Sequence, residues 1–100
     1  MSEARLVDRI EKAVNGGYPS AWVVKLADRY HRGLPDLMVT FRTSHNFGRT
    51  MWFETKAKDG RLSKIQIAEH DKIKRAGGLV FVAKSVDTVM ATLKEYGAVV

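Results

Sequence analysis

Two carboxylates and a lysine are spaced in this sequence so that together they could catalyse metal-assisted hydrolysis of a phosphodiester. Asp36 opens one apolar run of the sequence, and Glu54 and Lys56 lie inside a second one. Because side chains two residues apart on a strand project from one face, Glu54 and Lys56 share a face that Asp36 can reach from a neighbouring strand. Paired carboxylates can hold a hard divalent cation such as Mg²⁺, and a lysine beside them can orient or polarise an attacking water.

These residues also have a purely structural interpretation. Asp36 follows a proline, as many turn and strand-start residues do. Glu54 and Lys56 could pair on a solvated sheet face, where an ion pair adds little to stability. The functional interpretation is favoured because Glu54 lies in a segment that otherwise looks half-buried, and carboxylates are rarely buried without a partner.

Other polar residues compete for accessory roles around this set. Glu3 falls within the apolar stripe of the first expected helix and Glu11 at its edge, so either could supply an acid, with Glu3 favoured. Glu3 also fits a simple match to the helix dipole. Gln66 completes a capping box with Ser63 and could in addition support the lysine or touch phosphate. The histidines lack the spacing of a zinc site, and we interpret them as surface or loop residues: His31, His45 and His70.

The elements that position these residues follow from periodicity and turn signals. We expect helices over 2–14, 63–76 and 85–96, and strands over 21–26, 36–42, 51–57 and 79–83. Residues 28–34 are an expected polar loop, and the turn at 43–48 should use Asn46 and Gly48 for its special backbone geometry. The second and third strands then form a hairpin, and the step from 51 to 83 is long enough for a right-handed parallel crossover. The expected fold is therefore α/β, with a mixed sheet flanked by helices.

Two of these elements carry expectations about burial. The helix over 63–76 should turn Ile65, Ala68 and Ile73 inward and end at Gly77-Gly78. The nearly all-apolar strand over 79–83 should be buried on both faces.

Composition narrows the class of partner. One hundred residues with 45% hydrophobic content suit a single domain, 1–100, with one modest core. Seventeen Lys and Arg against 11 Asp and Glu give a net charge of +6, which favours nucleic acid. The absence of cysteine excludes disulfides and thiolate zinc sites. No stretch is apolar enough to span a membrane, and the first residues lack a signal-peptide core, so we expect a cytoplasmic protein.

Several stretches together resemble the VRR-NUC branch of the PD-(D/E)XK nuclease superfamily. They are Gly33–Leu37, Glu54–Lys56, Gly60–Gln66 and Gly77–Gly78. The resemblance spans roughly Glu3 to Ser85. It implies a restriction-endonuclease-like αβββαβ core, here followed by a C-terminal helix, which agrees with the order of elements inferred above.

The resemblance also implies roles for individual residues. Asp36, Glu54 and the backbone carbonyl of Thr55 would bind Mg²⁺ or Mn²⁺, and Lys56 would be the catalytic lysine. Gln66 would be the accessory polar residue of the following helix.

At the periphery of the site the resemblance is to Holliday-junction-resolving relatives. Glu3 would match the first-helix acid that those relatives use. The basic residues expected to contact nucleic acid are Arg32, Lys58, Arg61 and Lys64.

The predicted function is that of a metal-dependent DNA endonuclease, with four-way (Holliday) junctions as the expected substrate. Members of this size resemble phage or bacterial nucleases, so we expect action near the nucleoid or in a phage-infected host cytoplasm. A junction offers two symmetric scissile positions, which calls for a homodimer. Much of the final helix must face the protein's own core, so only part of its apolar surface can be spare for this contact. The candidate residues are Val89, Met90, Leu93, Tyr96, Val99 and Val100.

Two alternatives remain open. One is a non-catalytic nucleic-acid-binding module of the same fold, and the other is a nuclease directed at flaps or single strands. A restriction-type enzyme is disfavoured, because no segment is left over to read a sequence.

Overall fold

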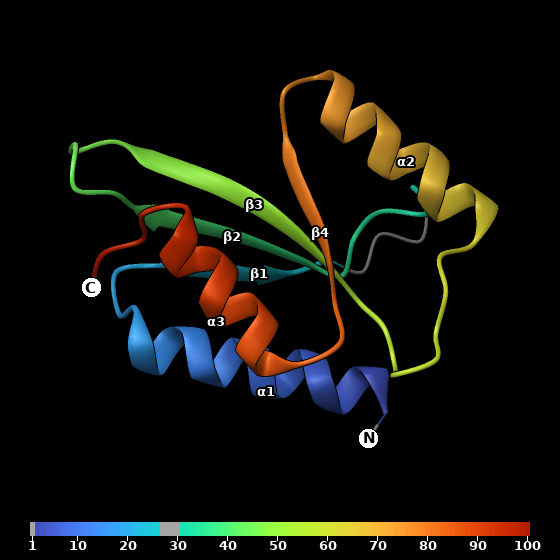
Figure 1. Ribbon diagram of the computed structural model, residues 1–100, viewed down its shortest axis with the longest axis horizontal. Coiled ribbons are helices and arrows are strands. Elements are labelled where there is room, and N and C mark those ends of the chain that lie inside the picture. The colour runs from blue at the N-terminus through green and yellow to red at the C-terminus, as the bar shows by residue number, and fades with distance from the viewer. Residues whose placement is uncertain (1, 27–30) are drawn as a thin grey trace.

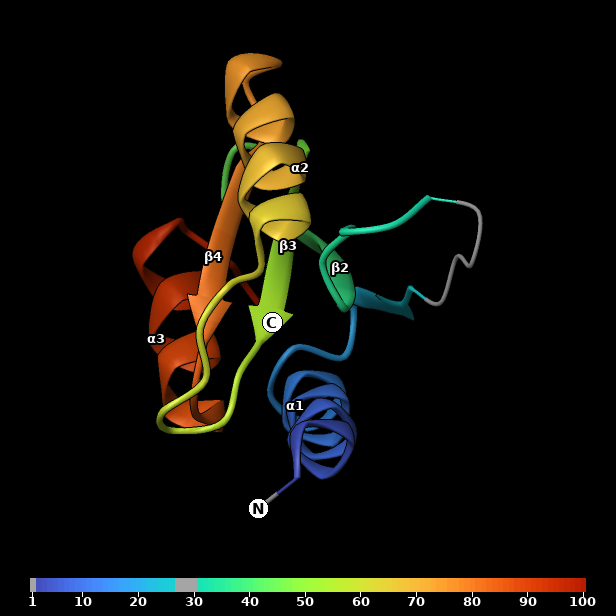
Figure 2. The same ribbon diagram turned by 90° about the vertical axis from the view of Figure 1, so that its right-hand side faces the viewer.

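A computed structural model of the chain describes residues 2–26 and 31–100. The elements, in chain order, are α1 (Glu3–Gly17), β1 (Trp22–Lys25), β2 (Leu37–Arg42), β3 (Gly48–Thr55), α2 (Lys64–Arg75), β4 (Leu79–Ala83) and α3 (Val86–Glu95). This is the expected order of elements. Figures 1 and 2 show α1 and α3 packed side by side, while α2 stands apart from them across the sheet.

The four strands form one mixed sheet in the order β1-β2-β3-β4. β2 pairs antiparallel with both β1 and β3, and β4 pairs parallel with β3 after the crossover through α2. The expected α/β architecture with a mixed sheet is therefore confirmed. Leu37 lies opposite Phe53 in this antiparallel pair. Asp36, which precedes Leu37, therefore comes level with Glu54, which follows Phe53, at the same end of the sheet.

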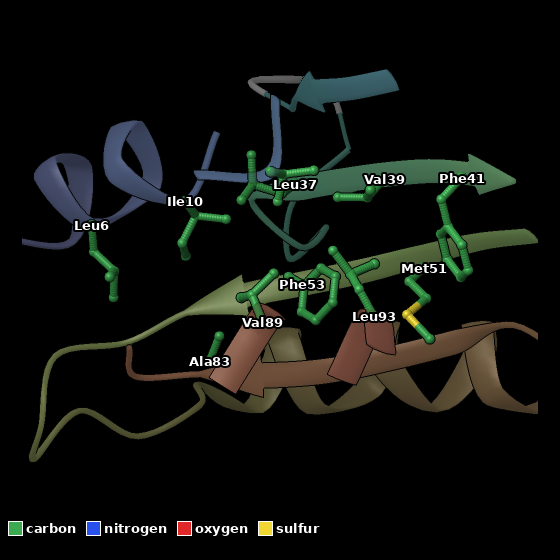
Figure 3. Close-up of a cluster of buried hydrophobic side chains, with 11 residues drawn as sticks. Leu6, Ile10, Leu37, Val39, Phe41, Met51, Phe53, Ala83, Val89 and Leu93 are labelled. Atoms are coloured by element: carbon green, nitrogen blue, oxygen red, sulfur yellow. The ribbon is translucent and has the colours of Figure 1, made fainter. Parts of the chain in front are cut away.

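One face of the sheet carries the apolar core. Leu6, Ile10 and Val14 recur every fourth residue along α1, which puts them on one side of the helix against the sheet. Figure 3 shows these α1 side chains, alternate residues of β2 and β3, and two residues of α3 meeting in a single cluster. Each large side chain buried there contributes roughly 1.5–3 kcal/mol of transfer free energy, so this layer holds the fold together.

The other face of the sheet is covered only in part, by α2. This helix begins with a complete capping box, in which Ser63 and Gln66 satisfy each other's backbone N–H groups. Its apolar side chains are less buried than expected. Ile65 is 43% exposed, Ala68 is exposed and Ile73 is half-buried. All residues of α2 are described, and the helix fully buries only His70.

Other local expectations met mixed outcomes. Asn46 does adopt a left-handed conformation, with φ 63° in the hairpin turn, whereas Gly48 does not and instead begins β3. The expected burial of the 79–83 strand on both faces is wrong at Val82, which is 38% exposed because α2 leaves that part of the sheet open. Of the expected 28–34 loop, residues 28–30 lie outside the described part of the chain. Among the described residues no helix is long and apolar enough to cross a membrane.

Part of the final helix packs into the protein's own core, as the sequence indicated. Val89 and Leu93 are completely buried, so they cannot contribute to a surface between two copies. The tail is also tied back, because the Val99 N–H donates to the Arg42 carbonyl at 3.0 Å. The expected dimer surface is therefore wrong for the buried helix positions and leaves Val100, 81% exposed, as its most accessible member.

Candidate metal centre

Asp36 is held at the start of β2 by the neighbouring strand. Its Oδ2 accepts two hydrogen bonds from Thr55, one from the backbone N–H and one from Oγ1, both at 2.7 Å. Thr55 is itself 1% exposed, so these bonds lie at the inner edge of the site. They hold one carboxylate oxygen of Asp36 against the end of β3.

Glu54 is a buried carboxylate, with only 2% of its surface exposed. It projects from the α2 face of the sheet, as does Asp36, because the two residues come level on paired strands. Burial first, and then hydrogen bonding and charge repulsion with Asp36, raise the pKa of Glu54 to about 8, although the Lys56 charge acts in the opposite direction. The two carboxyl groups therefore lie near each other at one end of the sheet, as the ligands of a single cation must.

Lys56 lies one residue beyond β3 but keeps the strand's direction, since its N–H donates to the Ala83 carbonyl at 3.0 Å. Its side chain is 14% exposed, and Nζ lies 3.8 Å from Glu3 Oε1. The structure thus places Glu3 beside the candidate lysine. Glu11 is elsewhere, where it and Asp8 pair with Lys25.

The sequence interpretation missed His70. It was assigned to the surface, but it is 4% exposed, and its Nε2 lies 3.4 Å from Glu54 Oε1. Burial, followed by the positive charges of Lys74 and Lys56, lowers the pKa of His70, so the contact joins neutral groups near pH 7 rather than an ion pair. A signal was available, because His70 follows Gln66 by one helical turn and so shares its face of α2.

The Gln66 side chain is part of the capping box at the start of α2. Its Oε1 accepts from the Ser63 backbone N–H at 2.9 Å, and the Gln66 N–H donates to Ser63 Oγ at 3.2 Å. Any role in the reaction would fall to the amide nitrogen of this half-buried side chain.

A cationic cavity of about 330 Å³ adjoins the site on the side of α1 and α3. Its charged lining consists of Arg9, Lys56, Lys58, Lys84 and Asp87. Lys84 Nζ donates to the Lys58 carbonyl at 2.9 Å, which joins the segments that follow β4 and β3. Arg9 and Lys84 were not predicted from the sequence. The predicted DNA contacts are all exposed: Arg32, Lys58, Arg61 and Lys64.

The donor atoms gathered here suit a hard divalent cation. Among the described residues there is no group of three His, Cys, Asp or Glu side chains that could hold a metal, so a zinc-type ligand set is absent from that part of the chain. Asp36 and Glu54 come level as two carboxylates at one end of the sheet. Mg²⁺ is commonly held by one or two carboxylates, with water and substrate phosphate supplying the rest.

Comparison with known proteins gives a consistent result. The family model of the VRR-NUC domain matches residues 2–87. A solved structure titled VRR_NUC domain is similar with a TM-score of 0.76 and 24% sequence identity, over 94% of this chain and 96% of that chain. No curated protein matches the chain. The structural likeness concerns the fold, and the family match spans every residue of the candidate centre.

Proposed function

The chain belongs to the VRR-NUC family, whose members are of nuclease type, and we propose that it is a metal-dependent endonuclease acting on DNA. The observation that carries the proposal is the convergence of buried Glu54 with Asp36 beside Lys56. Burying a carboxylate next to another one costs stability. A module that only binds a polyanion gains nothing from that cost, since the carboxylates repel phosphate.

In this proposal Asp36, Glu54 and the Thr55 carbonyl hold Mg²⁺ or Mn²⁺. When bound, such a cation polarises the scissile phosphate and lowers the pKa of a water molecule. Lys56 is not a ligand in this proposal; its side-chain nitrogen orients the attacking water or stabilises the negative charge that develops on the phosphate. Glu3, 3.8 Å from Lys56 Nζ, would hold that nitrogen in place.

The DNA backbone would run over the basic surfaces on either side of this centre. One is the cavity with Arg9, Lys58 and Lys84, and it is contiguous with the site because Lys56 forms part of its wall. The other would comprise Arg32, Arg61 and Lys64, all exposed. Cations on both sides of a scissile position support a substrate that continues in both directions, as an endonuclease requires.

A four-way junction remains the specific substrate that we propose, cut by a homodimer. The support is geometric, because two symmetric cuts need two copies of one site. Val89 and Leu93 are buried and cannot contribute to the contact, and the open part of the sheet offers a larger apolar surface for it. There Trp22 is 65% exposed, and Val24 and Trp52 on the same face are half-buried.

A cleavage assay with a matched pair of carboxylate variants tests the proposed activity. Linear, flap and four-way DNA are incubated with the wild type, Glu54→Gln and Glu11→Gln, in Mg²⁺, Mn²⁺ or chelator. Glu11→Gln is the control, since it removes a carboxylate of the same kind that lies beside Lys25. We expect the wild type and Glu11→Gln to cut only with metal, and Glu54→Gln to be inactive.

The same assay separates the alternatives. Cleavage by Glu54→Gln at the wild-type rate would remove Glu54 from the mechanism, and no cleavage by any protein would favour a binding module. Cutting of flaps or single strands in preference to junctions, by a monomer in sedimentation, would replace the junction proposal with the flap proposal.

A further inference from the structure

The contact between His70 and Glu54 is a feature of the centre that the proposed mechanism leaves unused. Both side chains are almost wholly buried, at 5% and 2% exposure, and Nε2 lies 3.4 Å from Oε1. A buried imidazole occupies a position where an apolar residue would pack α2 onto the sheet without a polar group to satisfy. The position therefore calls for an explanation beyond packing.

The two carboxylates of the centre are held in the same way. Asp36 has its Oδ2 engaged by Thr55, and Glu54 has its Oε1 engaged by His70. In each case a partner in the protein contacts one oxygen and so restrains the orientation of the carboxyl group. Partners of this kind orient ligating groups and are worth about 10- to 100-fold in metal affinity when removed.

We propose that His70 is a positioning residue, which orients Glu54 for metal binding by donating an Nε2–H hydrogen bond to Oε1. The inference rests on the proposed metal-dependent function. A ligating carboxylate is ionised and can only accept hydrogen bonds, so the imidazole must be the donor and its Nε2 must carry the hydrogen. Because His70 is the fully buried residue of α2, the helix is what brings this donor to the site.

The competing explanation is that His70 only anchors α2 to the sheet. The two explanations differ in what substitution does to metal affinity at a temperature where the protein is folded. Loss of an anchor lowers the melting temperature without changing the affinity of molecules that remain folded. Loss of a positioning residue weakens metal binding whatever happens to the melting temperature.

The test is calorimetric titration of Mn²⁺ into the DNA-free, 100-residue chain. The variants are His70→Leu, which removes the donor, and His70→Gln, whose amide nitrogen can reach a position close to that of Nε2. Ile73→Ala is the matched control, because it trims a half-buried side chain on the same helix without removing the donor. If His70→Leu fails to fold, His70→Asn replaces it, since its amide is too short to reach Glu54.

We expect His70→Leu or His70→Asn to weaken Mn²⁺ binding roughly 10- to 100-fold, with His70→Gln and Ile73→Ala close to the wild type. The inference would be overturned if His70→Leu, or its substitute His70→Asn, bound Mn²⁺ as tightly as Ile73→Ala does. Glu54→Gln, titrated alongside, separates the two proposals. If it binds Mn²⁺ as the wild type does, the metal site itself is wrong; if it loses binding while the His70 variants keep it, only the role of His70 is wrong.

Discussion

The two faces of the sheet bury neighbouring residues for opposite reasons. Phe53 is completely buried among apolar side chains of α1 and α3, whereas Glu54, the next residue, is 2% exposed among polar groups below α2. The first burial removes apolar surface from water and stabilises the fold. The second burial removes a carboxylate from water and destabilises the fold. One strand thus separates the part of the molecule that maintains the structure from the part that is set up for chemistry.

The difference extends to the helices on each face. α1 and α3 bury several apolar residues against the sheet, including Ile10 and Leu93. α2 leaves Ile65 and Ile67 largely exposed and meets the sheet through His70. The α2 face has therefore kept polar contacts that suit a ligand, at the expense of packing that would add stability.

The largest expected effect contrasts Phe53 with Glu54. Phe53→Ala should destabilise the protein by about 3–5 kcal/mol, because it removes a large side chain from the packed core and leaves a cavity. Glu54→Gln should leave stability near neutral pH equal or higher, since the amide keeps the shape and removes a buried acid. Urea denaturation of both variants measures this. Equal losses of stability would show that the two faces do not differ as argued.

The second prediction concerns the pH dependence of stability in the absence of metal. The folded-state pKa of Glu54, about 8, lies above its ordinary value of 4.5. The contribution of the Glu54 carboxyl group to the free energy of unfolding is therefore fully present below pH 4.5, falls as the pH rises and is lost above pH 8. The difference between the wild type and Glu54→Gln should change by at most about 4 kcal/mol between pH 5 and 8. Thermal denaturation across this range is the measurement, and a constant difference between the two proteins would contradict it.

How far the sequence predicts this molecule depends on how local each signal is. The 79–83 strand has its exact predicted bounds, and the capping box at Ser63 forms as expected, because turn residues, caps and short apolar runs act within a few residues. The inward-facing side of α2 was predicted wrongly, because Ile65 was expected to face inward and is 43% exposed. Its apolar residues form only a weak stripe, and contacts with the sheet decide which side turns inward.

The candidate site divides in the same way. Asp36, Glu54 and Lys56 could be brought together by strand alternation and pairing alone, and the structure places them at one end of the sheet. The only signal for the burial of His70 was the helix face that it shares with Gln66. That signal was weak, because the burial follows from where α2 docks and histidine is common both inside and outside proteins. The two bonds from Thr55 to Asp36 likewise depend on strand register rather than on residue spacing.

The third prediction separates binding from chemistry on the α2 face. Lys56→Ala should keep metal binding and most of its DNA affinity but slow cleavage roughly 10²- to 10³-fold, because the lysine acts on charge that develops during the reaction. Single-turnover cleavage at saturating protein, with Mn²⁺ titration as the control for the metal site, measures both quantities. A variant that cuts at the normal rate would make Lys56 part of the basic surface only.

The smallest expected effect distinguishes the cationic cavity from charge placed elsewhere. Lys58 lines this cavity, while Lys94 is exposed in the last turn of α3, at the other end of that helix from the residues that line it. Lys58→Ala removes one cation but leaves the Lys58 carbonyl that accepts from Lys84, so the local structure should persist. In a Glu54→Gln background, where DNA stays intact, the affinity should fall steeply with salt. Lys58→Ala should reduce that slope by about one unit, whereas Lys94→Ala should not change it. An equal reduction by both would mean that the protein attracts DNA through its net charge alone, with no defined path beside the metal centre.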